Sequence, residues 1–237
     1  MKDHLTTREV DFESINIVED EAALGELKEM GALVLPVLAR GTDHVIGLDM
    51  DQVRAFIGAE EAPPEVLPAD ELVQRVERFV PAAVRLAAQL PSDCHDQPIP
   101  GRQRTYLGLA NHIVAHVEIF LTLAGGAAFT LEGVDEEVLR GHERHVDAPQ
   151  QLGARAGEAT SRLREWLSTA TAGELDRVVP AFFGDQTVHQ LLAGCAYSVA
   201  QHTRQLTAVL EMLGIQPDES VGGDAYAGLP MPAGVWE

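Results

Sequence analysis

The sequence predicts an α+β protein in which a small N-terminal α/β module precedes a four-helix bundle. The first 58 residues alternate short β-like and helical patterns, which is typical of a small α/β unit. From residue 69 onward, four long segments instead carry apolar residues at helical spacing. A stretch rich in proline and acidic residues separates the two regions, and its composition predicts a linker. The chain therefore divides into a module, a linker, a bundle and a Gly/Pro-rich tail, at residues 1–58, 59–68, 69–215 and 216–237.

The module is expected to contain three strands and two helices. They follow in the order strand, helix, strand, strand, helix, at residues 10–18, 19–31, 32–40, 44–50 and 49–58. Gly31 and Gly58 are expected to end the two helices, because glycine is the preferred residue just past a helix C-terminus. Pro36 interrupts the second strand, which is apolar enough to be buried.

The bundle helices are expected at residues 69–90, 104–126, 147–170 and 186–213. Asp70 and Asp185 are the expected N-caps of the first and last of them, since a short acidic side chain accepts from the first free amides. Pro81 is expected to kink the first helix or split it in two. Gly214 closes the last helix.

Two further segments complete this region. A short helix is expected at about residues 135–145, with Asp135 as its cap. The tail is expected to drape over the surface of the bundle, with Trp236 holding it down.

The last helix has the clearest pattern in the chain. Its apolar positions advance in alternating steps of four and three residues, through Val188, Leu192, Cys195, Val199, His202, Leu206, Val209 and Leu213. This spacing is typical of a bundle seam, and His202 occupies a seam position. In the second helix, His112 and His116 fall four residues apart beside the apolar stripe. All three histidines are therefore expected to face the bundle interior.

Three inward-facing histidines allow two interpretations. Two histidines at i and i+4 on one helix face can share a metal ion, and a third from a facing helix makes a three-histidine site with one open position. Such a site activates water or a thiol. The alternative is that they are ordinary core histidines, neutral and hydrogen-bonded. Elsewhere we expect His142 and His145 to lie in a solvated turn, and Cys195 to pack as a small hydrophobic residue.

The charge and the cysteine count restrict the partners and the compartment. A formal net charge of −20 repels phosphate backbones and anionic lipid, so neither nucleic acid nor a membrane is an expected partner. No uninterrupted apolar run approaches the roughly 18 residues of a membrane span, and the N-terminal residues lack the apolar segment of a secretory signal. With only Cys94 and Cys195 as thiols, these features predict a reduced, cytoplasmic protein.

The bundle region resembles the DinB-like four-helix bundle family. The resemblance covers about residues 65–237 and rests on "LANHIV" in the second helix, "AQHTRQLTAVLEMLGI" in the last helix and "AGLPMPAGVW" in the tail. It implies a metal-binding bundle that holds nickel or zinc, assembles as a homodimer, and in some members acts as an S-transferase or isomerase with a thiol such as mycothiol or bacillithiol. The family's ligand pattern falls on His112, Ser198 and His202 in this sequence.

Ser198 departs from that pattern, because the family has histidine or glutamate there and a serine hydroxyl is a poor ligand. Either His116 replaces the missing ligand, or the site has lost its metal and the fold serves another purpose. We assign His112, His116 and His202 to the metal, and Ser198, Arg204 and Tyr197 to a substrate pocket in which Arg204 orients an anionic part of the thiol. The two function hypotheses are a metal-dependent enzyme acting on a low-molecular-weight thiol or small electrophile, and a metal-free protein that binds a small molecule or serves as a dimeric scaffold.

The N-terminal module resembles the later half of a glutaredoxin, an incomplete thioredoxin-like fold. The stretch "VDFESINIVEDEAALGELKEMGALVLPVLARGTDHVIGLD" carries the resemblance, and it implies a cis-proline at Pro36. The paired cysteines of that family are missing, so we expect no redox catalysis from the module. Its expected role is packing or dimerisation, with a remnant thiol-recognition role as the alternative.

Overall fold

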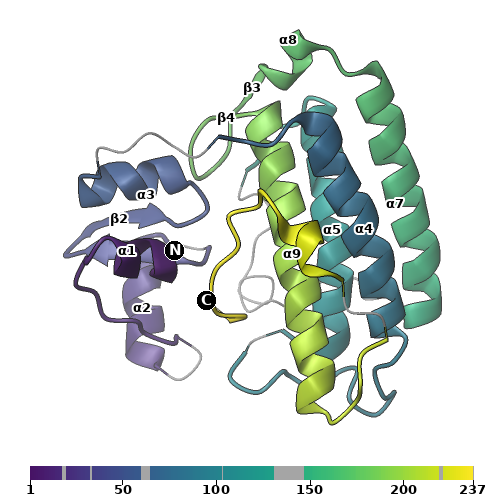
Figure 1. Ribbon diagram of the computed structural model, residues 1–237. Coiled ribbons are helices and arrows are strands. Elements are labelled where there is room, and N and C mark those ends of the chain that lie inside the picture. Colours follow the sequence, from purple (N-terminus) through teal and green to yellow (C-terminus); the bar gives the residue numbers. More distant parts are fainter. Residues whose placement is uncertain are drawn as a thin grey trace.

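Four long helices lie side by side as a bundle, and a small module of helices and a hairpin lies beside it (Figure 1). The structure is a computed structural model. It describes residues 1–17, 20–32, 34–59, 65–102, 104–130, 147–218 and 221–236. The bundle consists of α4 (Ala69–Ala87), α5 (Tyr106–Ala124), α7 (Pro149–Thr169) and α9 (Val188–Met212). The four predicted long helices are thus confirmed, and the helix expected at 135–145 lies outside the described residues.

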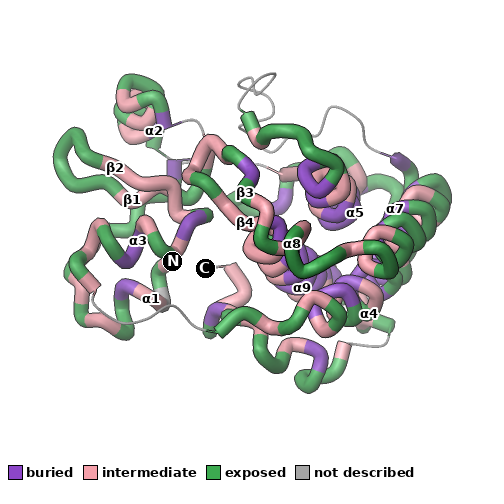
Figure 2. The backbone as a smooth tube through the Cα atoms, turned by 90° about the horizontal axis from the view of Figure 1, so that it is seen from above, coloured by how far each residue is buried: buried purple, intermediate pink, exposed green. Residues whose placement is uncertain are grey.

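The core lies where these helices meet, with α9 packed on both α4 and α5, and α7 packed on the same two helices (Figure 2). The seam predicted for α9 is confirmed, since Leu192, Val199, Leu206 and Val209 are fully buried. Full burial of one such side chain contributes roughly 1.5–3 kcal/mol to folding. The seam therefore determines which face of α9 points inward, and with it the direction of His202.

The predicted helix ends are partly wrong. Asp70 is not the N-cap of α4, because the helix begins at Ala69 and Pro68 takes the cap position. Asp70 instead lies in the first turn, where its charge favours the positive end of the helix. Pro81 does not split the helix, because α4 continues through it as one element.

The start of α9 is also displaced from the prediction. A short antiparallel hairpin of β3 (Val178–Val179) and β4 (Gln186–Thr187) precedes the helix. Thr187 ends this hairpin and caps α9, in a capping box with Gln190. Asp185 is therefore not the cap, because the residue after it is still paired in the hairpin.

Among its described residues, the N-terminal module contains three helices and one antiparallel hairpin. These elements are α1 (Lys2–Thr7), α2 (Glu21–Glu29), β1 (Val37–Arg40), β2 (Asp43–Ile46) and α3 (Met50–Ile57). The two predicted helices are confirmed as α2 and α3, and α1 was not predicted. The peptide bond before Pro36 is cis, as the glutaredoxin resemblance implied.

Two strand predictions in the module are wrong in part. The described residues 10–17 form no strand, and Ile15 is 53% exposed there. Strand-like spacing is not sufficient, because a strand also needs a neighbour to take up its backbone hydrogen bonds. The strand expected at 32–40 is shorter than predicted and begins after Pro36 as β1. It is half-buried to exposed instead of buried, since β2 is the one strand that pairs with it among the described residues.

The module meets the bundle at the turn between β3 and β4. The Asp49 carboxylate caps α3 with one oxygen and accepts from Gln186 Nε2 at 2.9 Å with the other. Gln52 donates to the backbone carbonyl of Phe183. At Gly184 the φ angle is +123°, and the Gln52 amide occupies the space that a Cβ would need. The contact therefore depends on polar side chains of the module reaching the bundle's hairpin.

The tail lies over the surface, as predicted, and runs along α9 (Figure 1). Its short 3-10 helix η1 (Gly223–Tyr226) buries Ala225 completely and places the Tyr226 ring 4.8 Å from the ring of Phe79. Trp236 lies under the Arg102 guanidinium, 4.9 Å from its carbon to the ring centroid. These contacts confirm that the tail is packed on the bundle.

One helix, α5, is long and apolar enough to cross a membrane by length and composition, with a mean hydropathy of 1.5 over its most apolar window. The sequence does not predict a span here, because His112 and His116 interrupt the apolar run. In the structure 61% of that window is buried inside the protein, as expected for the core helix of a bundle.

Candidate metal centre

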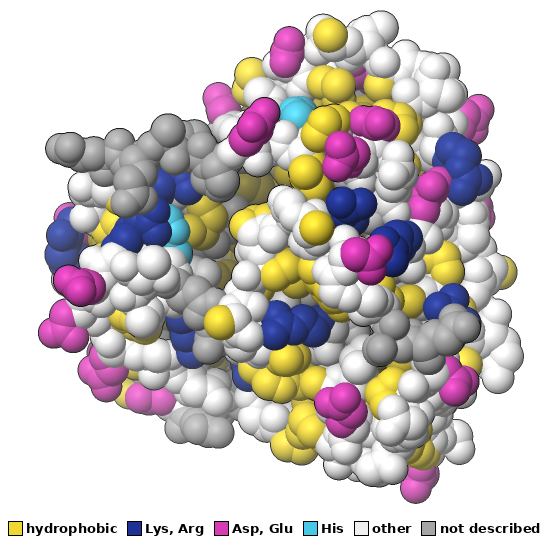
Figure 3. Space-filling model, viewed as in Figure 1, with side chains coloured by type: hydrophobic (Ala, Val, Ile, Leu, Met, Phe, Trp, Pro, Cys, Tyr) yellow, Lys and Arg dark blue, Asp and Glu magenta, His cyan; other side chains and the backbone are white. Residues whose placement is uncertain are grey.

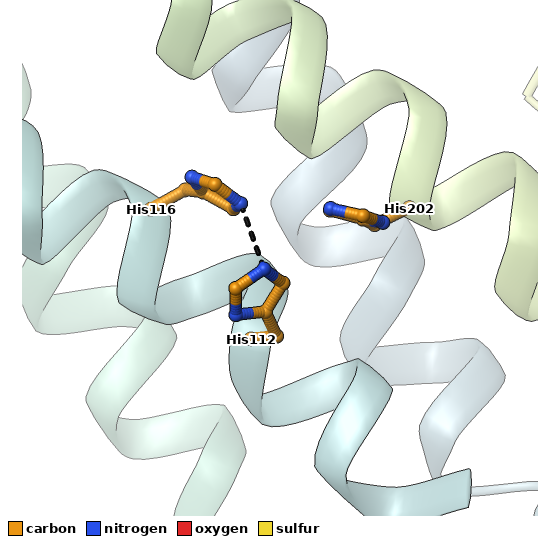
Figure 4. Close-up of side chains that lie close together, drawn as sticks. All are labelled: His112, His116 and His202. Carbon is orange, nitrogen blue, oxygen red and sulfur yellow. Dashed lines mark hydrogen bonds between the residues drawn. The ribbon is translucent and has the colours of Figure 1, made fainter. Parts of the chain in front are cut away.

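Three histidines from two helices converge between α5 and α9 (Figure 4). His112 and His116 lie one turn apart on α5, and His202 reaches them from α9. The Nε2 atoms of His112 and His116 are 3.0 Å apart. The His202 ring centroid lies 4.9 Å from that of His112 and 5.4 Å from that of His116. The prediction that the three rings meet is confirmed.

The spacing of the ring nitrogens suits a divalent cation. One nitrogen from each ring lies within 4.8 Å of the others. Two imidazole ligands of a tetrahedral zinc ion, each about 2.0–2.1 Å from it, are about 3.3–3.4 Å apart. The His112–His116 pair is already close to that separation. In the part of the chain that the structure describes, this is the only group of three histidine, cysteine or acidic side chains within such reach.

The protonation of the rings also suits a metal. Burial lowers the pKa of His112 well below the usual value, and the positive charge of Arg104 acts in the same direction. Burial, followed by the neighbouring His112, likewise lowers the pKa of His116. Both rings are therefore neutral at pH 7, and a neutral imidazole has the lone pair that a metal requires.

Polar contacts beside the site, buried at Asn111 and half-buried at Glu118, hold α5 to α7 and to the residues just before it. The Asn111 side chain donates to the Asp147 carbonyl at 3.0 Å and accepts from the Asp147 amide at 2.9 Å. Two residues beyond His116, Glu118 forms a two-bond ion pair with Arg155 at 2.7 and 2.8 Å. Paired contacts of this kind fix orientation as well as distance, so the α5 histidines lie on a rigid support.

The three residues predicted to form a substrate pocket differ from one another in where they lie. Ser198 and Tyr197 are half-buried on α9, four and five residues before His202. Arg204 donates to the carbonyls of Pro232 and Ala233 at 2.7 and 2.8 Å, and so binds the tail. The arginine whose charge acts on His112 and His116 is Arg104. We did not identify it from the sequence, because it lies eight residues before His112, ahead of α5 and outside the apolar pattern.

Two further described histidines, His95 and His189, and the thiol of Cys195 make structural contacts. His95 and His189 are half-buried and hydrogen-bonded to the carbonyls of Leu90 and Leu67 at 3.2 and 2.8 Å. The predicted solvated turn with His142 and His145 lies outside the described residues. Burial raises the pKa of Cys195 to about 12, which agrees with a small hydrophobic residue and not with a nucleophile.

Comparison with known proteins adds no family to this geometry. No protein-family model matches the chain, and a search of curated proteins finds no similar sequence. The functional argument therefore depends on the site itself. What the structure supports is a helical bundle with a histidine triad that is compatible with a divalent metal ion.

Proposed function

We propose that this protein is a metal-dependent enzyme acting on a low-molecular-weight thiol or small electrophile, of the S-transferase or isomerase type. The observation that carries the proposal is the convergence of three histidines, two of them neutral at pH 7, on one point between α5 and α9. Three imidazoles leave one position of a tetrahedral zinc or nickel site open, which is the arrangement of catalytic centres. The resemblance to DinB-like bundles supports the same class of reaction.

The residues of the chain have separate tasks in this proposal. His112, His116 and His202 hold the cation, which when bound lowers the pKa of a thiol or water at the open position. Arg104 contributes positive charge next to the site and favours an anionic substrate group. Ser198 and Tyr197, half-buried four and five residues before His202 on α9, are the residues we assign to the substrate pocket. On the face in Figure 3, apolar side chains line a hollow between the module and the bundle, which offers a surface for the uncharged part of a substrate.

A second candidate is a metal-free protein that binds a small molecule, or a dimeric scaffold. Two observations favour it. Ser198 stands where the family resemblance requires a metal ligand. The Nε2 atoms of His112 and His116 are also close enough to share a hydrogen bond, which requires a proton on one of them. A metal would displace that proton. That the protein is a cytoplasmic homodimer remains a prediction in both cases.

Metal analysis of protein purified without a histidine tag tests the proposal. We expect close to one zinc or nickel ion per chain in the wild type, and none in the His202→Ala variant. His95→Ala serves as the matched control, because it removes a half-buried histidine outside the cluster. Metal-free wild-type protein that gains no metal on incubation with zinc or nickel would reject the enzyme and leave the second candidate.

An activity assay then separates a catalytic metal from a structural one. We expect thiol-dependent consumption of an activated aryl halide, lost on chelation and restored by zinc or nickel. Metal that binds stoichiometrically without supporting any thiol-dependent reaction would indicate a structural site and would contradict the catalytic part of the proposal.

A further inference from the structure

A side-chain amide connects the third histidine to the tail. His202 Nδ1 lies 2.8 Å from Gln205 Oε1, and Gln205 Nε2 donates to the backbone carbonyl of Val235 at 3.1 Å. A carbonyl only accepts, so the NH₂ group of Gln205 must face Val235 and its oxygen must face the ring. That oxygen also only accepts, which places the ring proton on Nδ1. Neutral His202 therefore has its lone pair on Nε2, the nitrogen that points toward the other two rings in Figure 4.

The acceptor at the far end of this connection is held independently of Gln205. We define the C-terminal strap as residues 232–236. The Val235 carbonyl also accepts from Gln201 Nε2 at 2.7 Å. Arg204 binds the strap through two carbonyls, and Arg102 donates to the Trp236 carbonyl at 3.3 Å. Because these bonds fix the carbonyl, Gln205 cannot turn its amide over without losing a hydrogen bond.

We propose that Gln205 is a positioning residue and that the C-terminal strap is part of the candidate metal centre. Together they select the His202 tautomer that offers Nε2 to the cluster, and they fix the orientation of the ring. Histidine ligands of metals generally donate their second ring N–H to such an acceptor, and loss of the acceptor weakens metal binding about 10–100-fold. The effect on metal affinity rests on the proposed function, whereas the selection of the tautomer does not.

Gln201 offers a matched control on the same helix. Its side chain donates to the same Val235 carbonyl, but its hydrogen bond does not involve His202. Gln201→Leu and Gln205→Leu each remove one hydrogen bond to the strap, and only Gln205→Leu also removes the acceptor of His202. A purely structural role of Gln205 predicts similar results for both variants, whereas a positioning role separates them.

The first test measures the tautomer in metal-free protein by ¹⁵N NMR of the histidine side chains. We expect the Nδ1–H form of His202 in the wild type, in Gln201→Leu and in Gln205→Glu, which keeps an acceptor. In Gln205→Leu we expect a mixture of the two tautomers, or mainly Nε2–H. An unchanged tautomer in folded Gln205→Leu overturns the inference. If that variant does not fold, the Nε2–H form in the wild type or in Gln205→Glu overturns it.

The second test measures zinc affinity by competition with a chelating dye. We expect binding about 10–100-fold weaker in Gln205→Leu, and within about threefold of the wild type in Gln205→Glu and Gln201→Leu. Equal weakening in both leucine variants contradicts a positioning role. If the wild type binds no metal, the proposed function fails, and the tautomer comparison still decides the inference about Gln205.

Discussion

His116 is the most informative position to change, because the two interpretations of the site disagree about it. If the ligands follow the family pattern, His112 and His202 hold the metal and His116→Ala has little effect. The structure instead places His116 Nε2 3.0 Å from His112 Nε2, within a few tenths of an ångström of the separation expected for two zinc ligands. We therefore expect His116 to be a full ligand.

The expected effect follows from ligand linkage. Zinc at 100 times the dissociation constant stabilises the wild type by about 2.7 kcal/mol. For a domain of this size that raises Tm by about 5–11 °C. Loss of the hydrogen-bond acceptor of a metal-binding histidine weakens metal binding by up to about 100-fold. Loss of the histidine itself is therefore expected to weaken metal binding at least as much. At the same zinc concentration, zinc then stabilises His116→Ala by about 0.4 kcal/mol, which raises its Tm by at most about 2 °C.

Differential scanning calorimetry at pH 7, with and without zinc, measures this difference. The 37 acidic residues of the chain can bind zinc weakly, so the same scan with magnesium corrects for non-specific effects. His95→Ala is the control, and it should respond to zinc as the wild type does. If His116→Ala is stabilised as much as the wild type, His116 is not a ligand and the argument from the nitrogen separation is wrong.

Three further predictions concern the same region. Because the folded-state pKa values of His112 and His116 lie below the unfolded value of about 6.5, the unfolded chain binds more protons under acid conditions. The metal-free protein should therefore lose stability as the pH falls below about 6.5, by at most about 2.7 kcal/mol per pH unit for two protons. Urea unfolding at several pH values measures this loss. The free energy of unfolding should change less steeply with pH in the variant with both His112 and His116 replaced by alanine. Cys195, with its pKa near 12, should resist iodoacetamide at pH 8 in the folded protein and react in urea, as mass spectrometry would show; rapid alkylation of the native thiol would contradict its burial. Arg155→Met should destabilise the protein by about 1.5–3 kcal/mol, since it removes the charged hydrogen bonds to Glu118, and the urea midpoint would stay unchanged if this ion pair were only a solvated surface contact.

Apolar periodicity predicted the bundle and the meeting of its histidines. A seam with steps of four and three residues is a local pattern that defines one face of a helix, and burial of that face determines where it points. His202 lies on the seam, and His112 and His116 lie beside the corresponding stripe of α5. Burial of both apolar faces therefore turns all three rings toward the bundle interior.

The sequence was less informative where a structure depends on a distant partner. Residues 10–17 have the spacing of a strand but no neighbouring strand, and Asp185 has the chemistry of a cap but precedes a hairpin residue. Composition and spacing report the preference of a segment, and they do not report which segment lies next to it.

In the candidate site, too, the sequence predicted local positions but not the contacts between distant residues. The helical repeat places His116 one turn from His112, but only packing against α9 shows that both lie close to His202. Arg204 had the charge expected of a substrate ligand, and the fold uses it to bind the strap, while Arg104 acts on the histidines. Gln205 lies three residues after His202, and its role depends on a carbonyl thirty residues further along the chain. Local spacing therefore predicted which side chains face inward, whereas their hydrogen-bond partners depend on contacts between helices and tail that form only when the chain folds.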